Sequence, residues 1–199
     1  MFTRNSVEEL TACYLIPARG GSKRIVDKNV QEIDGMPLVM WPVCEADEIG
    51  IPAYVSTDSL KISNAVNASL RVVTILDRPE ELSQDDSSTW DLLEHHDLPY
   101  DLIGIRQPTS PFVGAETAHK AFALAAQTNM CVGLAHHELG RKTLHKSGLW
   151  VIPKDMIHGK RYMYAGNWIF LGVDSFAAVD IDTHRDLMEA RELWAKLHR

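Results

Sequence analysis

The sequence predicts an α/β fold with a mostly parallel sheet and helices on both faces. Short apolar runs that suit buried strands alternate with segments of helical character along most of the chain. Polar motifs directly follow several of these runs, and no internal repeat or low-complexity segment interrupts the order. A regular β-α-β-α order is typical of a parallel sheet whose crossover helices cover its faces.

The first half of the chain supplies three strands and three helices. The apolar run ACYLI ends at Pro17, which favours a buried strand. Pro37 suits the start of a helix, and Pro42 is predicted to lie in its first turn or to kink it. Ser87 or Ser88 can cap the third helix. The expected strands are 12–16, 52–56 and 70–76, and the expected helices are 37–48, 59–69 and 87–96.

The second half continues the alternation and then changes character. Thr183 followed by Asp186 resembles a capping box at the start of the closing helix. Residues 136–165 are rich in His, Lys, Gly and Met and are predicted to form a shortened flap or dimerisation excursion. The expected strands are 100–107, 130–135 and 166–173, with a helix at 114–128. We therefore expect a single domain over residues 1–199, with residues 1–11 as an N-terminal extension.

Composition narrows the class of protein. The 199 residues carry a formal net charge of -7, which argues against a nucleic-acid or anionic-membrane partner. Cys13, Cys44 and Cys131 are widely spaced and match no metal or redox pattern, so they are interpreted as buried thiols in a reducing compartment. No apolar run approaches the ~18 residues of a membrane span, and the first residues lack a signal-peptide pattern. The expected location is cytoplasmic.

A glycine-rich basic stretch, PARGGSKRIVDKN, follows the first predicted strand. Gly20 and Gly21 allow the backbone to approach a ligand closely, and successive N–H groups in such a turn can bind an anion. Arg19, Lys23 and Lys28 add charged donors for phosphate oxygens. The stretch matches neither the Walker A nor the dinucleotide pattern. Its sequence predicts a phosphate cradle, with a solvated basic turn as the alternative.

Two carboxylates lie near the C-terminus in the stretch DID. Asp180 and Asp182 flank one apolar residue, so in an extended conformation both side chains point the same way. Carboxylates beside bound phosphates can hold Mg²⁺, which prefers oxygen ligands. The alternative is that one of them caps the last helix or pairs with a basic residue.

Three motifs are expected to meet in one cleft. Residues 17–29, 56–58 and 107–111 each follow a predicted strand. Ligands of open α/β sheets bind beyond the carboxyl ends of the strands. The shared position favours a common site for all three.

Five stretches, in order along the chain, carry a family resemblance. They are IPARGGSKRIVDKN, VSTD at 55–58, DRPEELSQDDSST at 77–89, RQPTSPF at 106–112 and DIDTHRDLMEAREL at 180–193. Together they resemble the acylneuraminate cytidylyltransferases, which activate sialic acids and related nine-carbon 2-keto sugar acids. Relatives that activate the eight-carbon acid Kdo share the fold, but the glycine loop and QPTSP are more similar to the acylneuraminate type. The resemblance implies a Rossmann-like, nucleotidyltransferase (glycosyltransferase-A-like) fold.

The resemblance also implies a reaction: CMP is transferred from CTP to the anomeric hydroxyl of the sugar acid, and pyrophosphate is released. It implies a role in this reaction for each matching position. The implied nucleotide-binding residues are Arg19, Gly20, Gly21, Ser22, Lys23, Asn29, Arg78, Ser87 and Thr89. Gln107, Thr109 and Ser110 would face the sugar acid. Asp180 and Asp182 would bind the Mg²⁺ cofactor. The implied catalytic residues are Arg19, Lys23, Lys28, Gln107 and Asp182. Simpler alternatives are a surface ion pair for Arg78, a helix start for Ser87 and Thr89, and a turn for Thr109 and Ser110.

The chain also departs from the family pattern. Asp27 places a carboxylate in the cationic loop, where it is expected to pair with Arg24. Residues 136–179 are a short version of the region that in relatives builds the sugar pocket and the dimer arm, so a homodimer is only an expectation. Two alternatives remain: a nucleotidyltransferase of this fold with another nucleotide or sugar substrate, and a non-catalytic nucleotide-binding homologue.

Overall fold

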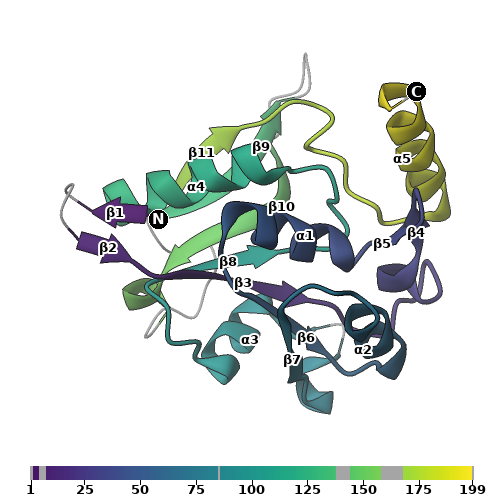
Figure 1. The fold of residues 1–199 in the computed structure, drawn as a ribbon, viewed down its shortest axis with the longest axis horizontal. Coiled ribbons are helices and arrows are strands. Elements are labelled where there is room, and N and C mark those ends of the chain that lie inside the picture. The colour runs from purple at the N-terminus through teal and green to yellow at the C-terminus, as the bar shows by residue number, and fades with distance from the viewer. Residues whose placement is uncertain (1, 5–7, 85, 138–143, 158–167, 199) are drawn as a thin grey trace.

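A seven-stranded sheet forms the centre of the molecule (Figure 1). The computed structural model describes residues 2–4, 8–84, 86–137, 144–157 and 168–198. The strands follow the order β11 (Trp168–Gly172), β9 (Cys131–His137), β10 (Leu144–Pro153), β8 (Leu102–Arg106), β3 (Ala12–Pro17), β6 (Ala53–Thr57) and β7 (Val73–Asp77). Strand β10 runs antiparallel to both neighbours, and every other pair is parallel. The predicted mostly parallel α/β sheet is confirmed.

Helices cover both faces, and the strands divide their side chains between two cores. Tyr14 and Ile16 of β3 belong to the core beneath α1 (Met40–Ile49), α2 (Leu60–Asn67) and α4 (Ala115–Thr128). Cys13 and Leu15 point to the opposite core with α3 (Thr89–His96). This alternation follows from the two-residue period of a strand. A third apolar cluster joins α5 (His184–Leu197) to the small hairpin of β4 (Glu32–Ile33) and β5 (Met36–Pro37).

Local sequence signals explain most element boundaries. Ser88 and Thr183 each form a capping box with an aspartate three residues later, so α3 and α5 begin close to where the sequence predicts. The predicted helix 37–48 begins only at Met40, because Pro37 lies in β5. Pro42 is the third residue of α1, in the first turn, where its missing N–H has no intrahelical partner to lose.

The segment predicted as a flap contributes a strand to the central sheet. Strand β10 lies between β9 and β8, with Leu149 and Val151 in one core and Trp150 and Ile152 in the other. It is followed by a short 3-10 helix, Lys154–Met156. Residues 138–143 and 158–167 lie outside the described residues, so the flap and dimer interpretations of those parts remain predictions.

The N-terminal segment packs against the domain. Strands β1 (Phe2–Arg4) and β2 (Glu8–Leu10) form an antiparallel pair. The ring of Phe2 lies 5.1 Å from that of Phe122 in α4, measured between centroids. The described part of this predicted extension therefore contributes to the core.

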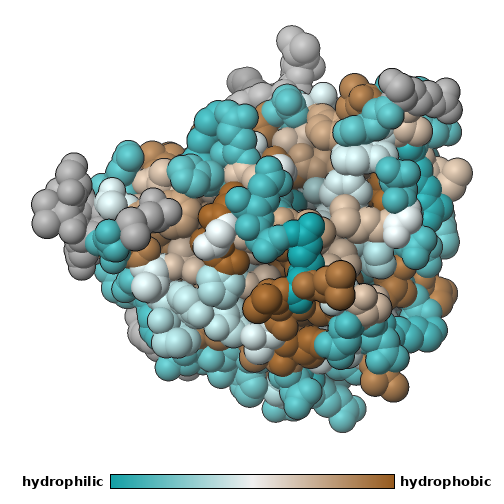
Figure 2. Space-filling model, in the orientation of Figure 1, coloured by the Kyte–Doolittle hydropathy of each residue, from teal (hydrophilic) through white to brown (hydrophobic). Residues whose placement is uncertain are grey.

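The surface is predominantly polar, with local apolar groups. Figure 2 shows hydrophobic residues gathered below the centre of one face and surrounded by hydrophilic ones. Among the described residues, Leu60, Leu70 and Val72 are large hydrophobic side chains left exposed on and near α2 and β7. No helix in the described ranges is long and apolar enough to cross a membrane.

Candidate active site

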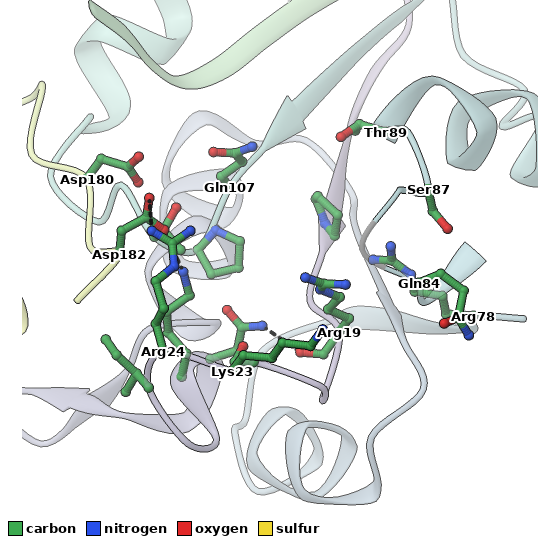
Figure 3. A pocket seen from close by; sticks show the side chains of 17 residues that line it. Arg19, Lys23, Arg24, Arg78, Gln84, Ser87, Thr89, Gln107, Asp180 and Asp182 are labelled. Carbon is green, nitrogen blue, oxygen red and sulfur yellow. Dashed lines mark hydrogen bonds and ion pairs between the residues drawn. The ribbon is translucent and has the colours of Figure 1, made fainter. Parts of the chain in front are cut away.

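A cavity of about 750 Å³ opens at the carboxyl ends of the parallel strands (Figure 3). Its walls come from the loop after β3, the segment between β7 and α3, the loop after β8, and the stretch before α5. Residues from the predicted stretches 17–29 and 107–111 meet here, as the strand-end argument predicted. The third stretch, residues 56–58, does not line the cavity, which corrects that part of the prediction. The predicted site residues that line the cavity are Arg19, Ser22, Lys23, Lys28, Asn29, Arg78, Ser87, Thr89, Gln107, Thr109, Asp180 and Asp182.

Three predicted residues do not line the cavity, and five unpredicted ones do. Gly20, Gly21 and the fully buried Ser110 are absent from its wall. The added residues are Pro17, Arg24, Ile25, Gln84 and Pro108. The sequence could have predicted Gln84 as a site residue, because it lies in the stretch DRPEELSQDDSST between the predicted site residues Arg78 and Ser87.

Asp58 and Asn29 hold the backbone of the glycine loop by hydrogen bonds. The backbone N–H of Gly20 donates to Asp58 Oδ1 at 2.7 Å, and a Cβ on Gly20 would lie 2.8 Å from Ser59 Cβ. Only glycine allows this approach without displacing the start of α2. Asn29 is buried and donates to the carbonyl of Arg19 at 3.0 Å. Gly20, Asp58 and Asn29 thus shape the loop whose basic side chains face the cavity.

Two arginines are fastened to the segment after β7. Arg19 Nη1 donates to the carbonyl of Ser83 at 3.2 Å. Arg78 donates through Nε to the carbonyl of Leu82 at 2.8 Å and through Nη2 to the same oxygen. Burial lowers the pKa of Arg78, against the opposing effect of Asp58. The two guanidinium groups are therefore held at the cavity wall, rather than in the surface ion pair considered for Arg78.

The hydroxyl groups of Ser87 and Ser88, at the start of α3, make different hydrogen bonds. Ser88 is the N-cap and accepts from Asp91 N at 3.1 Å. Ser87 donates instead to the carbonyl of Glu81 at 2.8 Å, and both Ser87 and Thr89 line the cavity. The helix-start alternative, considered for Ser87 and Thr89, therefore fits Thr89, the first residue of α3, and not Ser87, which precedes the N-cap.

The two aspartates lie opposite the basic loop and in different surroundings. Lys28 Nζ is 3.1 Å from Asp182 Oδ1, and Arg24 Nη1 is 3.2 Å from Asp182 Oδ2. Asp180 contacts a hydroxyl group instead, because Ser110 Oγ donates to Asp180 Oδ1 at 3.4 Å. Burial raises the pKa of Asp180, a hydrogen bond with Thr109 opposes this, and nearby Asp182 reinforces it.

The predicted ion pair between Asp27 and Arg24 is wrong. Asp27 has a positive φ of 52° and pairs with Lys61 of α2, with 2.5 Å between Oδ2 and Nζ. The left-handed backbone turns Asp27 out of the lining of the cavity, and aspartate tolerates this conformation better than most residues. The carboxylate therefore anchors the loop to α2, while Arg24 pairs with Asp182.

The charges of the cavity suit an anion together with a divalent cation. Five cationic side chains line it against two carboxylates, although the whole chain has a net charge of -7. No group of three or more His, Cys, Asp or Glu side chains that could hold a metal occurs among the described residues. Two carboxylates still fit Mg²⁺, which is commonly bound by one or two carboxylates plus substrate phosphates and water.

Fold and cavity together define an α/β protein with a cleft, lined by cationic side chains and two aspartates, at the carboxyl ends of its parallel strands. A family model described as cytidylyltransferase matches residues 13–148. The chain belongs to this cytidylyltransferase family.

Curated relatives confirm the resemblance to the acylneuraminate type. The chain is 34% identical over 128 residues to CMP-N,N'-diacetyllegionaminic acid synthase of Legionella pneumophila, a match that covers 59% of this chain and 54% of the relative. It is 34% identical over 103 residues to an N-acylneuraminate cytidylyltransferase of Escherichia coli, covering 49% of this chain and 24% of the relative. The chain thus spans about half, and about a quarter, of the lengths of these relatives.

Solved structures share the fold at low sequence identity. CMP:2-keto-3-deoxy-manno-octonic acid synthetase, solved in complex with CTP, has a TM-score of 0.75 and 17% identity. The match covers 94% of this chain and 99% of that chain. This likeness supports the nucleotidyltransferase form of the α/β fold.

Proposed function

We propose that the protein transfers CMP from CTP to the anomeric hydroxyl of a nine-carbon, sialic acid-like 2-keto sugar acid and releases pyrophosphate. The observation that carries this proposal is the single cavity in which Lys23 and Lys28 of the basic loop, Gln107, Asp180 and Asp182 meet. Membership of the cytidylyltransferase family and the names of the curated relatives support the choice of CTP and of the acceptor.

The triphosphate would lie along the basic side of the cavity. Arg19 and Lys23 extend into the cavity from the glycine loop, and Lys28 lies beside Asp182. The cytosine and ribose would contact the segment between β7 and α3, through Arg78, Gln84, Ser87 and Thr89. In this arrangement charged donors would bind the phosphates, and mostly neutral polar groups would bind the cytosine and ribose.

The sugar acid would approach from the loop after β8. In Figure 3 Gln107 lies on the side of the view opposite Lys23 and Arg19 of the basic loop, and Thr109 lines the same cavity. The anomeric hydroxyl forms a bond to the α-phosphorus while the bond to the pyrophosphate oxygen breaks. The protein contributes chiefly positioning and charge neutralisation, as in other phosphoryl-type transfers.

Asp180 and Asp182 are the residues that would hold Mg²⁺. The ion would neutralise charge on the phosphate oxygens during transfer. Because Lys28 and Arg24 already contact Asp182, the chain compensates this carboxylate without a metal ion.

The test is a nucleotide panel scored by pyrophosphate release. Purified protein is incubated with Mg²⁺, a mixture of nine-carbon 2-keto sugar acids, and CTP, GTP, UTP or ATP in turn. We expect pyrophosphate with CTP and only background with the others. Preference for another nucleotide would indicate a different nucleotidyltransferase. CTP binding without pyrophosphate from any acid would favour a non-catalytic homologue.

A further inference from the structure

A buried ion pair lies directly behind Gln107. Arg106 is the last residue of β8 and is fully buried. Its Nε donates to Glu45 Oε1 at 2.9 Å and its Nη2 donates to Oε2 at 3.0 Å, while Glu45 of α1 is only 5% exposed. Removing two charges from water is costly, and well-packed apolar residues often serve stability equally well. The pair therefore calls for a role beyond holding α1 to the sheet.

Tyr14 completes the pair as a third partner. Its hydroxyl donates to Glu45 Oε1 at 2.6 Å from the centre of β3. Burial, and then the Glu45 carboxylate, raise the pKa of Tyr14, so the phenol remains a donor. Burial alone would lower the pKa of Arg106, but Glu45 raises it, so the guanidinium stays charged. Because Nε and Nη2 of Arg106 donate to Glu45, its remaining nitrogen, Nη1, can donate to a different group.

That nitrogen fixes the backbone of Gln107. Arg106 Nη1 donates to the carbonyl of Gln107 at 2.8 Å and lies 3.5 Å from the carbonyl of Gly148. The N–H of Gln107 donates to the same Gly148 carbonyl at 2.8 Å. Both peptide groups flanking the Cα of Gln107 are therefore held, and Pro108 restricts the chain that follows. A fixed Cα limits the directions in which the Gln107 side chain can enter the cavity.

The same contacts continue to Asp180. The N–H of Gly148 donates to Ser110 Oγ at 3.2 Å, and Ser110 Oγ donates to Asp180 Oδ1 at 3.4 Å. A Cβ on Gly148 would overlap the side chain of Ser110, so β10 passes too close for any other residue. Buried polar groups connected in this way hold a fixed arrangement when every member is satisfied.

We propose that Arg106, held by Glu45 and Tyr14, is a positioning residue that sets the place of Gln107 and, through Gly148 and Ser110, of Asp180. The inference rests on the proposed function, because it assigns Gln107 to the sugar acid. An apolar side chain at 106 could fill the same space but could not donate to the Gln107 and Gly148 carbonyls. The ion pair therefore links the α1 face of the core to the acceptor side of the cavity.

The test removes all three polar groups together. Tyr14→Phe/Glu45→Leu/Arg106→Met leaves no unpaired buried charge, so the variant is expected to fold with a melting temperature near that of the wild type. We expect the CTP KM to stay within about twofold and kcat/KM for the sugar acid to fall about 10- to 100-fold, as displacement of a positioning group does. Tyr100→Phe, which removes a core hydrogen bond to Tyr54, is the control and should keep both constants.

Two outcomes distinguish the positioning role from the proposed function. Wild-type constants for both substrates in the triple variant would overturn the positioning role while leaving the proposed function intact. A wild-type protein that releases no pyrophosphate would instead refute the proposed function. In that case, or if the triple variant fails to fold, crystal structures of the wild type and Arg106→Lys decide. Lysine keeps the charge but lacks the planar fork. An unmoved Gln107 in that variant would refute the inference, and a displaced Gln107 would support it.

Discussion

Asp182 is shared by two cations that differ in how firmly they are held, and the looser one is Arg24. The Arg24 side chain is 66% exposed and contacts Asp182 Oδ2 through Nη1 at 3.2 Å. Lys28 is 16% exposed and donates both to Asp182 Oδ1 and to the carbonyl of Ile181, each at 3.1 Å. An exposed ion pair contributes little free energy and is easily exchanged. Arg24 is thus the cation that an incoming metal ion would displace.

Arg24→Gln should therefore tighten divalent-metal binding in the absence of nucleotide. Removing an exposed ion pair worth up to about 1 kcal/mol predicts roughly fivefold tighter Mn²⁺ binding, measured by titration followed with electron paramagnetic resonance. Arg185→Gln is the matched control, because Arg185 forms an exposed pair with Glu189 on α5. Unchanged or weaker Mn²⁺ binding in Arg24→Gln would refute the competition.

Asp182→Asn should abolish metal-dependent turnover while the fold survives. The substitution keeps the shape of the side chain but removes the charge that holds the cation, so we expect at least roughly a hundredfold loss of kcat. Asp27→Asn is the control, since Asp27 pairs with Lys61 and does not line the cavity. Steady-state pyrophosphate release measures both, with circular dichroism to check folding. Near-wild-type turnover in Asp182→Asn would remove the metal assignment.

The two loop glycines should respond differently to alanine. A Cβ on Gly20 would clash with Ser59, whereas a Cβ on Gly21 meets no atom within 4 Å. Gly20→Ala should lower the free energy of unfolding by about 1–3 kcal/mol and raise the Kd for CTP, because the loop must shift. Gly21→Ala should keep stability within about 0.5 kcal/mol. Chemical denaturation and calorimetric CTP titration test the pair, and equal stability loss in both would contradict the steric role assigned to Ser59.

The stability of the protein should fall in mild acid partly through His96. Its Nε2 lies 2.9 Å from Ser56 Oγ, and burial, then His95, then Arg78, lower its pKa below the usual 6.5. A lowered pKa means that the unfolded chain binds more protons between the two pKa values, so stability is full above pH 6.5 and is lost as pH falls toward the folded-state pKa.

His96→Gln should weaken this acid dependence and His95→Gln should weaken it less. Melting temperatures measured from about pH 7.5 down to about pH 5 give the comparison. If the melting temperature of His96→Gln falls with pH as steeply as that of the wild type over the acid half of this range, another group causes the loss of stability.

The sequence predicted what depends on local signals. The glycine loop, the capping box at Thr183, a serine cap at the start of α3 and the position of Gln107 after a strand are all encoded within a few residues. The strand-end rule for parallel sheets then correctly placed the glycine loop and Gln107 in one cleft, but not residues 56–58.

The sequence could not show what depends on distant partners. Arg106 closes an apolar strand, and its burial is set by Glu45, 61 residues away. Asp27 finds Lys61 instead of its near neighbour Arg24, because its left-handed backbone turns it toward α2. The place of β10 in the sheet follows from pairing with β8 and β9, which a short apolar run does not reveal.

The most direct test of the proposed function is mass spectrometry of the reaction product. Wild-type protein is incubated with CTP, Mg²⁺ and single nine-carbon 2-keto sugar acids, alongside the Asp182→Asn variant. We predict a CMP-sugar of the expected mass with at least one acid, formed together with pyrophosphate and strongly reduced in the variant. Absence of any CMP-sugar across the acids, or equal yield from Asp182→Asn, would contradict this prediction.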